Sequence, residues 1–153
     1  GGGFSSRLTE EIREKRGLTY SVYSYLLPFK KASLFIGGAS TKNENVHETI
    51  SIIRSELSRI AKEGATEEEL KNAKTYLTGS YALRFDTSSK IAGQLLGIQW
   101  ANLGIDYPIK RNGLINAVTL EDIKRVSKRI IKPDEIKFTV VGQPVEKLGE
   151  KSN

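Results

Sequence analysis

The stretch REKRGLTY, Arg13–Tyr20, places arginine and tyrosine side chains on either side of an abrupt change in local structure. A charge-rich helix is expected to stop at Gly17, and the run TYSVYSY begins two residues later. A guanidinium offers a fork of hydrogen-bond donors, and a phenol offers one more. The spacing alone favours a solvated cation at the end of a helix and a half-buried aromatic residue in a strand.

His47 is the single histidine of the sequence and lies in VHETI, where the letters HE resemble part of a metallopeptidase helix. The zinc motif H-x-x-E-H and its inverted form each need two histidines, so that both side chains reach one metal ion. With one histidine and no cysteine, this sequence builds neither form. We therefore interpret His47 as a structural or surface residue.

Other catalytic arrangements have equally little support. The serines include no G-x-S-x-G, and one histidine on a helix is a poor candidate for the base of a triad. The glycine-rich run GGGFSS, residues 1–6, lacks the lysine of a P-loop and the spacing of a dinucleotide site. We expect these glycines to let the start of the first helix approach a neighbouring element closely.

The basic run KRVSKRIIKPDEIK, Lys124–Lys137, holds six cationic residues in a chain of net charge +6. Only Phe138 is aromatic nearby, so the run offers no stacking platform for single-stranded nucleic acid. We interpret it as the solvated face of a helix. A basic nucleic-acid-binding domain is the less favoured alternative, which salt-sensitive binding to DNA or RNA would revive.

The bulk composition is that of an ordinary globular protein, with 38% hydrophobic and 27% charged residues among 153. The absence of cysteine excludes disulfides and thiol catalysis, and the absence of methionine suggests a fragment or a processed piece. No run approaches the ~18 apolar residues of a membrane span, and no signal peptide is visible. We expect a single domain over residues 1–142, truncated at its N-terminus, and a polar tail over 143–153.

The elements around Arg13 and Tyr20 are predicted from hydrophobic periodicity. A first helix is expected from a serine cap at residue 5 or 6 to Arg16, with Leu8 and Ile12 on one face. Beyond Gly17, alternation at period two predicts a strand that places Tyr20 and Val22 on the same side. Pro28 then marks a turn to a second strand, ASLFIGGAS, which its two glycines are expected to end or bulge.

Helices are predicted for most of the remaining chain. A long helix ends at Gly64, Thr66 and Glu69 form a capping box for the next, and a third runs from Asp86 or Thr87 to near Gly104. Pro108 is expected to break the chain before a last helix framed by Thr119 and Asp122. The predicted inward-facing residues are Val46, Ile50, Ile53, Leu57, Ile60, Leu70, Ala73, Leu77, Tyr81, Ile91, Leu95, Ile98, Trp100, Ile123, Val126 and Ile130.

A closing strand, IKFTVVG, is predicted after a turn at Pro133 and Asp134. The resulting class is α+β, an antiparallel sheet with helices packed on one face. Three strands are few to support this much helix, so we expect one or more N-terminal strands to be missing from this fragment.

The sequence resembles the C-terminal half of insulinase/pitrilysin-type zinc peptidases over essentially its whole length. The specific parts are GGGFSSRLTEEIREKRGLTYSVYSY and the segment from TEEEL to LRF. SLFIGGAS and the closing FTVVGQP agree with the same family, and the final helix and strand are generic. The resemblance implies half of a metallohydrolase clamshell, in which two homologous halves close around an extended peptide.

In that family one half brings the H-x-x-E-H zinc site, and the other brings an arginine and, seven residues on, a tyrosine. The matching residues here are Arg13 and Tyr20. The resemblance implies that Arg13 holds a substrate carbonyl and that Tyr20 donates to the scissile carbonyl as it becomes an oxyanion. Arg16 and Tyr23 share the spacing, but LTYSV aligns best with the family's tyrosine and favours Arg13 and Tyr20.

The resemblance therefore implies the non-catalytic, substrate-binding half of a zinc metalloendopeptidase, inactive alone. No cofactor is expected on this chain, and zinc is expected in a homologous partner half or subunit that carries H-x-x-E-H. The alternative is a catalytically silent structural subunit of the same fold. Bacterial members with separate subunits suggest the periplasm, with the cytoplasm as the alternative.

Overall fold

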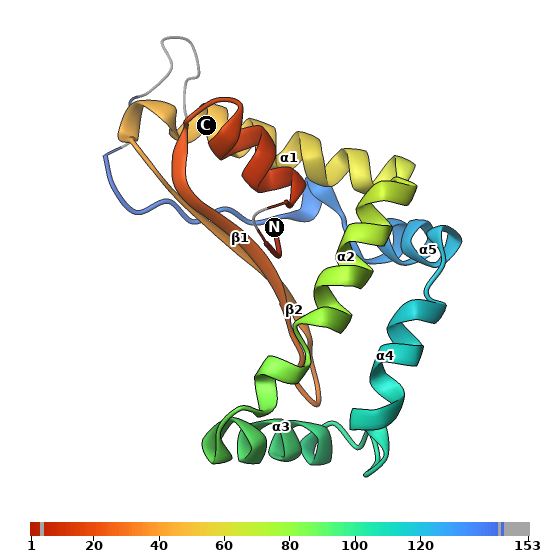
Figure 1. The fold of residues 1–153 in the computed structure, drawn as a ribbon. Helices are drawn as coiled ribbons and strands as arrows, with labels where there is room; N and C mark the ends of the chain where they lie inside the picture. The colour runs from red at the N-terminus through yellow and green to blue at the C-terminus, as the bar shows by residue number, and fades with distance from the viewer. Residues whose placement is uncertain (4, 144, 146–153) are drawn as a thin grey trace. The chain divides into compact units, whose positions relative to one another are not determined.

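A two-stranded hairpin and a series of helices make up the computed structural model, which describes residues 1–3, 5–143 and 145 (Figure 1). The chain divides into two units, one formed by Gly1–Arg59 with Ile131–Asn153 and the other by Ile60–Ile130. The α+β class predicted from the sequence is confirmed. None of the helices in the described part of the chain combines the length and hydropathy that a bilayer crossing requires.

The first helix is helical from Arg7 and widens into a π-helix over Thr9–Glu14. Its apolar residues Leu8 and Ile12 are 5% and 0% exposed, as their spacing predicted. The helix ends before Gly17, whose φ of 61° lies in the left-handed region that favours glycine. The predicted stop at this glycine is therefore confirmed.

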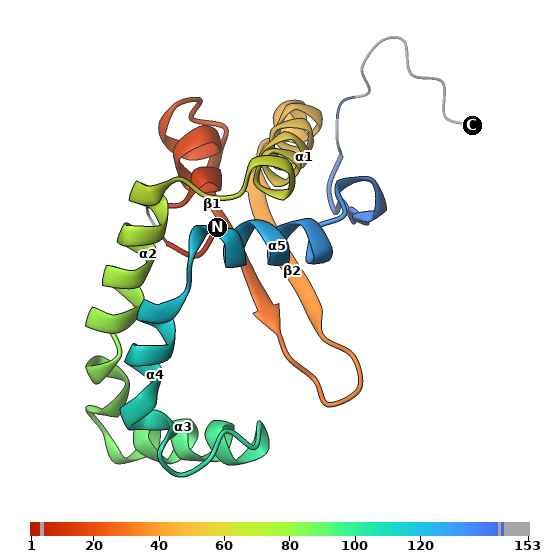
Figure 2. The same ribbon diagram turned by 90° about the vertical axis from the view of Figure 1, so that its right-hand side faces the viewer.

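The hairpin pairs β1 (Thr19–Leu27) with β2 (Leu34–Thr41) in antiparallel register, and the two strands run side by side in both views (Figures 1 and 2). The prediction that Gly37 and Gly38 end or bulge the second strand is wrong, since β2 continues to Thr41. Gly38 instead makes room for an aromatic ring, because a Cβ there would lie 2.7 Å from Tyr23 Oη on the facing strand.

The core of the first unit lies between the first helix, the hairpin and α1 (Val46–Glu63). Leu8, Ile12 and Val22 form its buried centre, and Leu18, Ile52 and Ile53 pack against them. Leu18 thus folds back beneath the helix end. Ile53 of the apolar stripe predicted for α1 packs against this core, together with Ile52, which lies outside the predicted stripe.

The second unit holds α2 (Glu67–Gly79), α3 (Ser88–Trp100), α4 (Tyr107–Ala117) and α5 (Leu120–Ile130). The capping box of α2 is confirmed, with Thr66 N–H donating to Glu69 Oε2 at 2.7 Å and Glu69 N–H donating to Thr66 Oγ1 at 3.2 Å. Thr87 caps α3, and Thr119 with Asp122 caps α5.

The helix α4 was not predicted, because Pro108 was interpreted as a break. Pro108 lies in the first turn of α4, where the missing N–H removes no helical hydrogen bond. The predicted inward face is confirmed for Tyr81 and Ile98, which are 8% and 9% exposed. It is wrong for Ala73, Ile91, Leu95, Trp100 and Ile130, which are exposed.

The predicted closing strand, residues 136–142, is wrong: no strand is formed there in the structure. A strand needs a neighbouring backbone to pair with, and this segment is held by a side chain instead. Arg54 of α1 donates to the Pro133 carbonyl oxygen at 2.7 Å and lies over the Phe138 ring, 5.0 Å from its centre. The predicted polar tail, residues 143–153, lies mostly outside the described residues.

Candidate functional site

Arg13 and Tyr20 come together at the junction between the first helix and β1. The guanidinium carbon of Arg13 lies over the Tyr20 ring, 5.9 Å from its centre, within the range of a cation–π contact. Tyr20 is 87% exposed and the Arg13 side chain is 38% exposed, so both are accessible to a ligand. Arg13 Nε also lies 3.5 Å from Glu14 Oε1.

Tyr20 projects outward because it is the extra residue of a β-bulge. Thr19 pairs with Thr41 and Ser21 pairs with Ser40, so Tyr20 has no opposite residue on β2. The bulge shifts the alternation of the strand, since Thr19 and Val22, three residues apart, are both buried. The prediction that Tyr20 and Val22 share a side is therefore wrong, and Tyr20 points to solvent.

The hydroxyl groups of two threonines tie down the backbone around this bulge. Thr19 Oγ1 donates to the Ser21 carbonyl oxygen at 2.5 Å, and Thr41 Oγ1 donates to the Leu18 carbonyl oxygen at 2.5 Å. Sequence reasoning missed both threonines, because a bulge depends on the register with the facing strand. No local pattern in the sequence could have identified them.

The backbone also connects Tyr20 to the helix that carries Arg13. Leu18 N–H donates to the Ile12 carbonyl oxygen and Gly17 N–H donates to the Arg13 carbonyl oxygen, each at 3.0 Å. The π-helix is wider than an α-helix, and single π-turns are frequent at functional sites. Helix end, glycine and bulge together determine the separation of the Arg13 and Tyr20 side chains.

Arg16 and Tyr23, the other pair with the same spacing, are each engaged elsewhere. Arg16 Nη1 lies 2.7 Å from Glu11 Oε2 and donates to the Glu11 carbonyl oxygen at 2.6 Å. The Tyr23 ring lies against Gly38 and stacks on Tyr25, with ring centres 6.1 Å apart. The junction therefore brings together Arg13 and Tyr20 and not these two side chains.

Glu11 anchors the charges on the outer face of the first helix. Hydrogen bonds from Lys15, first, and Arg16, second, lower the pKa of the Glu11 carboxyl to about 2. The same network raises the pKa of Lys15, mainly through its hydrogen bond to Glu11 and also through Glu10. Glu11 and Lys15, four residues apart on the helix, form an ion pair with Oε1 and Nζ 2.7 Å apart.

Gly1 lies directly against β1. A Cβ on Gly1 would lie 2.5 Å from Ser24 Oγ, and Ser24 N–H donates to the Gly1 carbonyl oxygen at 3.2 Å. The close approach expected of the glycine-rich start is confirmed at this glycine.

The side chains that could hold a metal do not gather in the described residues. His47 is the second residue of α1 and is partly exposed. Across residues 1–3, 5–143 and 145, no group of three or more histidine, cysteine, aspartate or glutamate side chains could ligate an ion.

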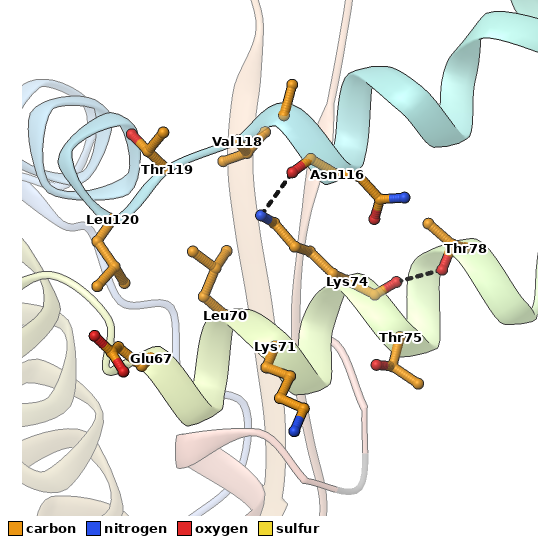
Figure 3. A pocket seen from close by; sticks show the side chains of 11 residues that line it. Glu67, Leu70, Lys71, Lys74, Thr75, Thr78, Asn116, Val118, Thr119 and Leu120 are labelled. Carbon is orange, nitrogen blue, oxygen red and sulfur yellow. Dashed lines mark hydrogen bonds between the residues drawn. The ribbon is translucent and has the colours of Figure 1, made fainter.

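A hollow of about 560 Å³ lies in the second unit, between α2 and the segment that joins α4 to α5 (Figure 3). Lys74 crosses it, with Nζ donating to the Asn116 carbonyl oxygen at 2.8 Å. The titratable side chains of its lining are Glu67, Lys71 and Lys74, with no histidine and no second carboxylate.

A family model described as "Peptidase M16 inactive domain" matches residues 1–77, a range that contains both Arg13 and Tyr20. The chain belongs to the peptidase M16 family. The family resemblance inferred from the sequence is thus confirmed, and the matched domain is the one described as inactive.

Relatives and solved structures agree with this assignment. An uncharacterized zinc protease of Streptomyces coelicolor is 35% identical over 86% of this chain and 28% of its own length. A non-peptidase homolog of Helicobacter pylori is 29% identical over 92% of this chain and 33% of its own length. A crystal structure of a peptidase M16 inactive domain from Pseudomonas fluorescens matches with a TM-score of 0.76 and 33% identity, over 88% of this chain and 32% of that one. The chain thus spans about a third of the length of these relatives.

Proposed function

We propose that this chain is the substrate-binding, non-catalytic half of a zinc metalloendopeptidase. Arg13 and Tyr20 hold the peptide backbone and stabilise the oxyanion, while a homologous partner half supplies the zinc. One observation carries the proposal: the Arg13 guanidinium lies over the ring of Tyr20 at the exposed junction between the first helix and β1. The β-bulge at Tyr20 directs this side chain to solvent.

The chemistry of the two groups suits peptide hydrolysis. The Tyr20 phenol donates one hydrogen bond, which strengthens as the scissile carbonyl oxygen gains negative charge. The Arg13 guanidinium carries a permanent charge and several donors in one plane, which suits a neighbouring backbone carbonyl. Neither group attacks the peptide, so the nucleophile must come from elsewhere.

The metal is assigned to the partner because this sequence holds one histidine and no cysteine. A catalytic zinc ion has three protein ligands and one position for water. The zinc ion lowers the pKa of the water bound there. A partner half with H-x-x-E-H supplies two of these ligands from one helix. The bound peptide would then lie between the partner's zinc and Arg13 and Tyr20.

A catalytically silent subunit of the same fold is the second candidate. It is favoured by the Helicobacter pylori relative, which is named a non-peptidase homolog and aligns with 92% of this chain. The fold alone does not separate the two candidates, because a silent subunit keeps the same helices and hairpin. Cleavage assays separate them.

The test is cleavage of a quenched fluorescent peptide by the full-length parent, alone and mixed with the subunit that carries H-x-x-E-H. Activity is expected only where zinc and this half are combined. Tyr20→Phe removes one hydroxyl and is expected to lower kcat about 100-fold or more. Tyr23→Phe, on the same strand and 50% exposed, is the matched control and should keep activity.

Each other outcome identifies a different error. Full activity in Tyr20→Phe contradicts the role given to Tyr20. An equal loss in Tyr23→Phe shifts the role to the second pair of the same spacing. No cleavage in any mixture, with both proteins folded, supports the silent subunit.

A further inference from the structure

The bulge at Tyr20 is held by side-chain hydrogen bonds in addition to the strand ladder. Thr19 Oγ1 donates to the Ser21 carbonyl oxygen, which follows the bulge, and Thr41 Oγ1 donates to the Leu18 carbonyl oxygen, which precedes it. Both bonds are 2.5 Å long. The carbonyl groups on either side of Thr19 and Tyr20 are therefore fixed.

A third threonine supports this arrangement from α1. Thr49 lies in the first turn of that helix, is 2% exposed, and donates to Thr41 Oγ1 at 3.4 Å. The hydroxyls of Thr49 and Thr41 thus form a short chain that ends on the Leu18 carbonyl oxygen. The chain joins α1 to the residue that lies between the Gly17 turn and the bulge.

Packing alone does not require these hydroxyl groups. Thr19 is 6% exposed, and a buried valine has nearly the same shape as a buried threonine. The Thr19 hydroxyl adds a hydrogen bond to the carbonyl oxygen of Ser21, two residues further along the chain. This hydrogen bond can form only where the backbone is bulged. In a regular strand the Thr19 side chain would not turn back to the carbonyl of Ser21.

We infer that Thr19 and Thr41, supported by Thr49, are positioning residues for Tyr20. They hold the bulge that directs the phenol away from the core and toward the substrate. The inference rests on the proposed function, because it assigns these residues an effect on the oxyanion donor. A displacement of about 1 Å at a catalytic group lowers rates up to about 100-fold, so loss of either bond should be measurable.

Leu18 extends this effect to Arg13. Its carbonyl oxygen is bound by Thr41, and its N–H is bound by the carbonyl oxygen of Ile12, the residue before Arg13. Loosening Leu18 therefore changes the distance between the two functional side chains. Thr41→Val is expected to affect both Arg13 and Tyr20, whereas Thr19→Val acts on Tyr20 alone.

The experiment uses the full-length parent with its zinc-bearing partner and the quenched peptide. Thr19→Val should lower kcat about 10-fold or more with little change in KM, and Thr19→Ser, which keeps the hydroxyl, should restore most of the rate. If Thr19→Val does not fold, Thr41→Val removes the other bond at the bulge and should also lower kcat about 10-fold or more, with a part of the loss that acts through Arg13. Thr78→Val removes a similar hydroxyl-to-carbonyl bond from α2 and is the matched control.

A double-mutant cycle separates positioning from general stabilisation. If Thr19 acts through the phenol, Thr19→Val should cost less than about 2-fold in a Tyr20→Phe background. The same 10-fold loss in both backgrounds, or a loss in Thr78→Val of equal size, would overturn the inference. If Tyr20→Phe itself keeps full activity, the proposed function fails first.

A measurement without catalysis tests the premise. Amide hydrogen exchange at residues 18–21 of the folded parent should become faster in Thr19→Val and Thr41→Val but not in Thr78→Val. Unchanged exchange and unchanged kcat together would show that the hydroxyls do not hold the bulge.

Discussion

The guanidinium of Arg13 lies over the ring of Tyr20, although a helix end, a left-handed glycine and a β-bulge separate the two residues along the chain. Both side chains remain accessible in this arrangement, since Tyr20 is 87% exposed and the Arg13 side chain is 38% exposed. A peptide carbonyl that approaches the junction would therefore meet donors from both side chains.

Arg13→Lys is expected to lower kcat/KM about 10- to 100-fold, because a hydrogen bond to a charged group contributes about 1.5–3 kcal/mol. Lysine keeps the charge but loses the planar fork of donors. The measurement is cleavage of the quenched peptide by the parent and its zinc-bearing partner. Arg16→Lys is the control, since Arg16 binds Glu11, and it should stay within about 2-fold of the wild type.

A silent outcome for Arg13→Lys would show that charge alone suffices. A larger loss in Arg16→Lys would move the role to the second pair. The control is the unfolding midpoint, which should be the same in both variants as in the wild type.

Gly17→Ala is expected to lower the free energy of unfolding by about 1–2 kcal/mol, because an alanine is strained at a φ of 61°. A Cβ at this position meets no atom within 4 Å, so the cost comes from the backbone alone. Urea unfolding of the full-length parent measures it.

Gly79→Ala is the matched control for this prediction. Gly79 closes α2, and a Cβ there also meets nothing within 4 Å, but its φ is not positive. Alanine should therefore leave the free energy of unfolding unchanged or raise it by up to about 1 kcal/mol. If both variants lose the same stability, the conformation of Gly17 is not what ends the first helix.

Glu11 is expected to titrate at about pH 2, well below the ordinary value of 4.5. Since its pKa is lowered on folding, its contribution to stability is present above about pH 4.5 and is lost as the pH falls toward 2. The measurement is an NMR titration of the side-chain carboxyl carbon in the folded protein. In Lys15→Gln the pKa should rise, because the hydrogen bond from Lys15 is the largest cause of the shift. A wild-type pKa near 4.5 would contradict the charge network.

Short-range signals were the ones that the sequence predicted well. The stop at Gly17, the capping box of Thr66 and Glu69, and the apolar face of the first helix depend on residues within one or two turns. Such signals act through local backbone geometry, and tertiary context leaves them unchanged.

The features that were missed depend on contacts between distant segments. The bulge at Tyr20 is defined by the register of β1 with Thr41 and Ser40 of β2. The closing strand predicted for residues 136–142 does not form, because a strand requires a second backbone segment to pair with. A proline breaks a helix when it lies in the interior but is favoured in the first turn. The structure shows that Pro108 lies in the first turn of α4. Arg13 and Tyr20 were selected by family resemblance, whereas their contact arises from the π-turn and the bulge.

Chelator is expected to abolish cleavage by the combined halves while leaving the unfolding midpoint of the parent unchanged. The proposed mechanism places the zinc on the partner, and residues 1–3, 5–143 and 145 of this chain hold no cluster of ligating side chains. The midpoint is measured by thermal unfolding of the full-length parent, with and without chelator, and cleavage is restored by added zinc. A lower midpoint in chelator would place a zinc site on the parent polypeptide itself. Cleavage that persists in chelator would contradict the zinc-dependent mechanism and leave Arg13 and Tyr20 without the nucleophile that the proposal requires.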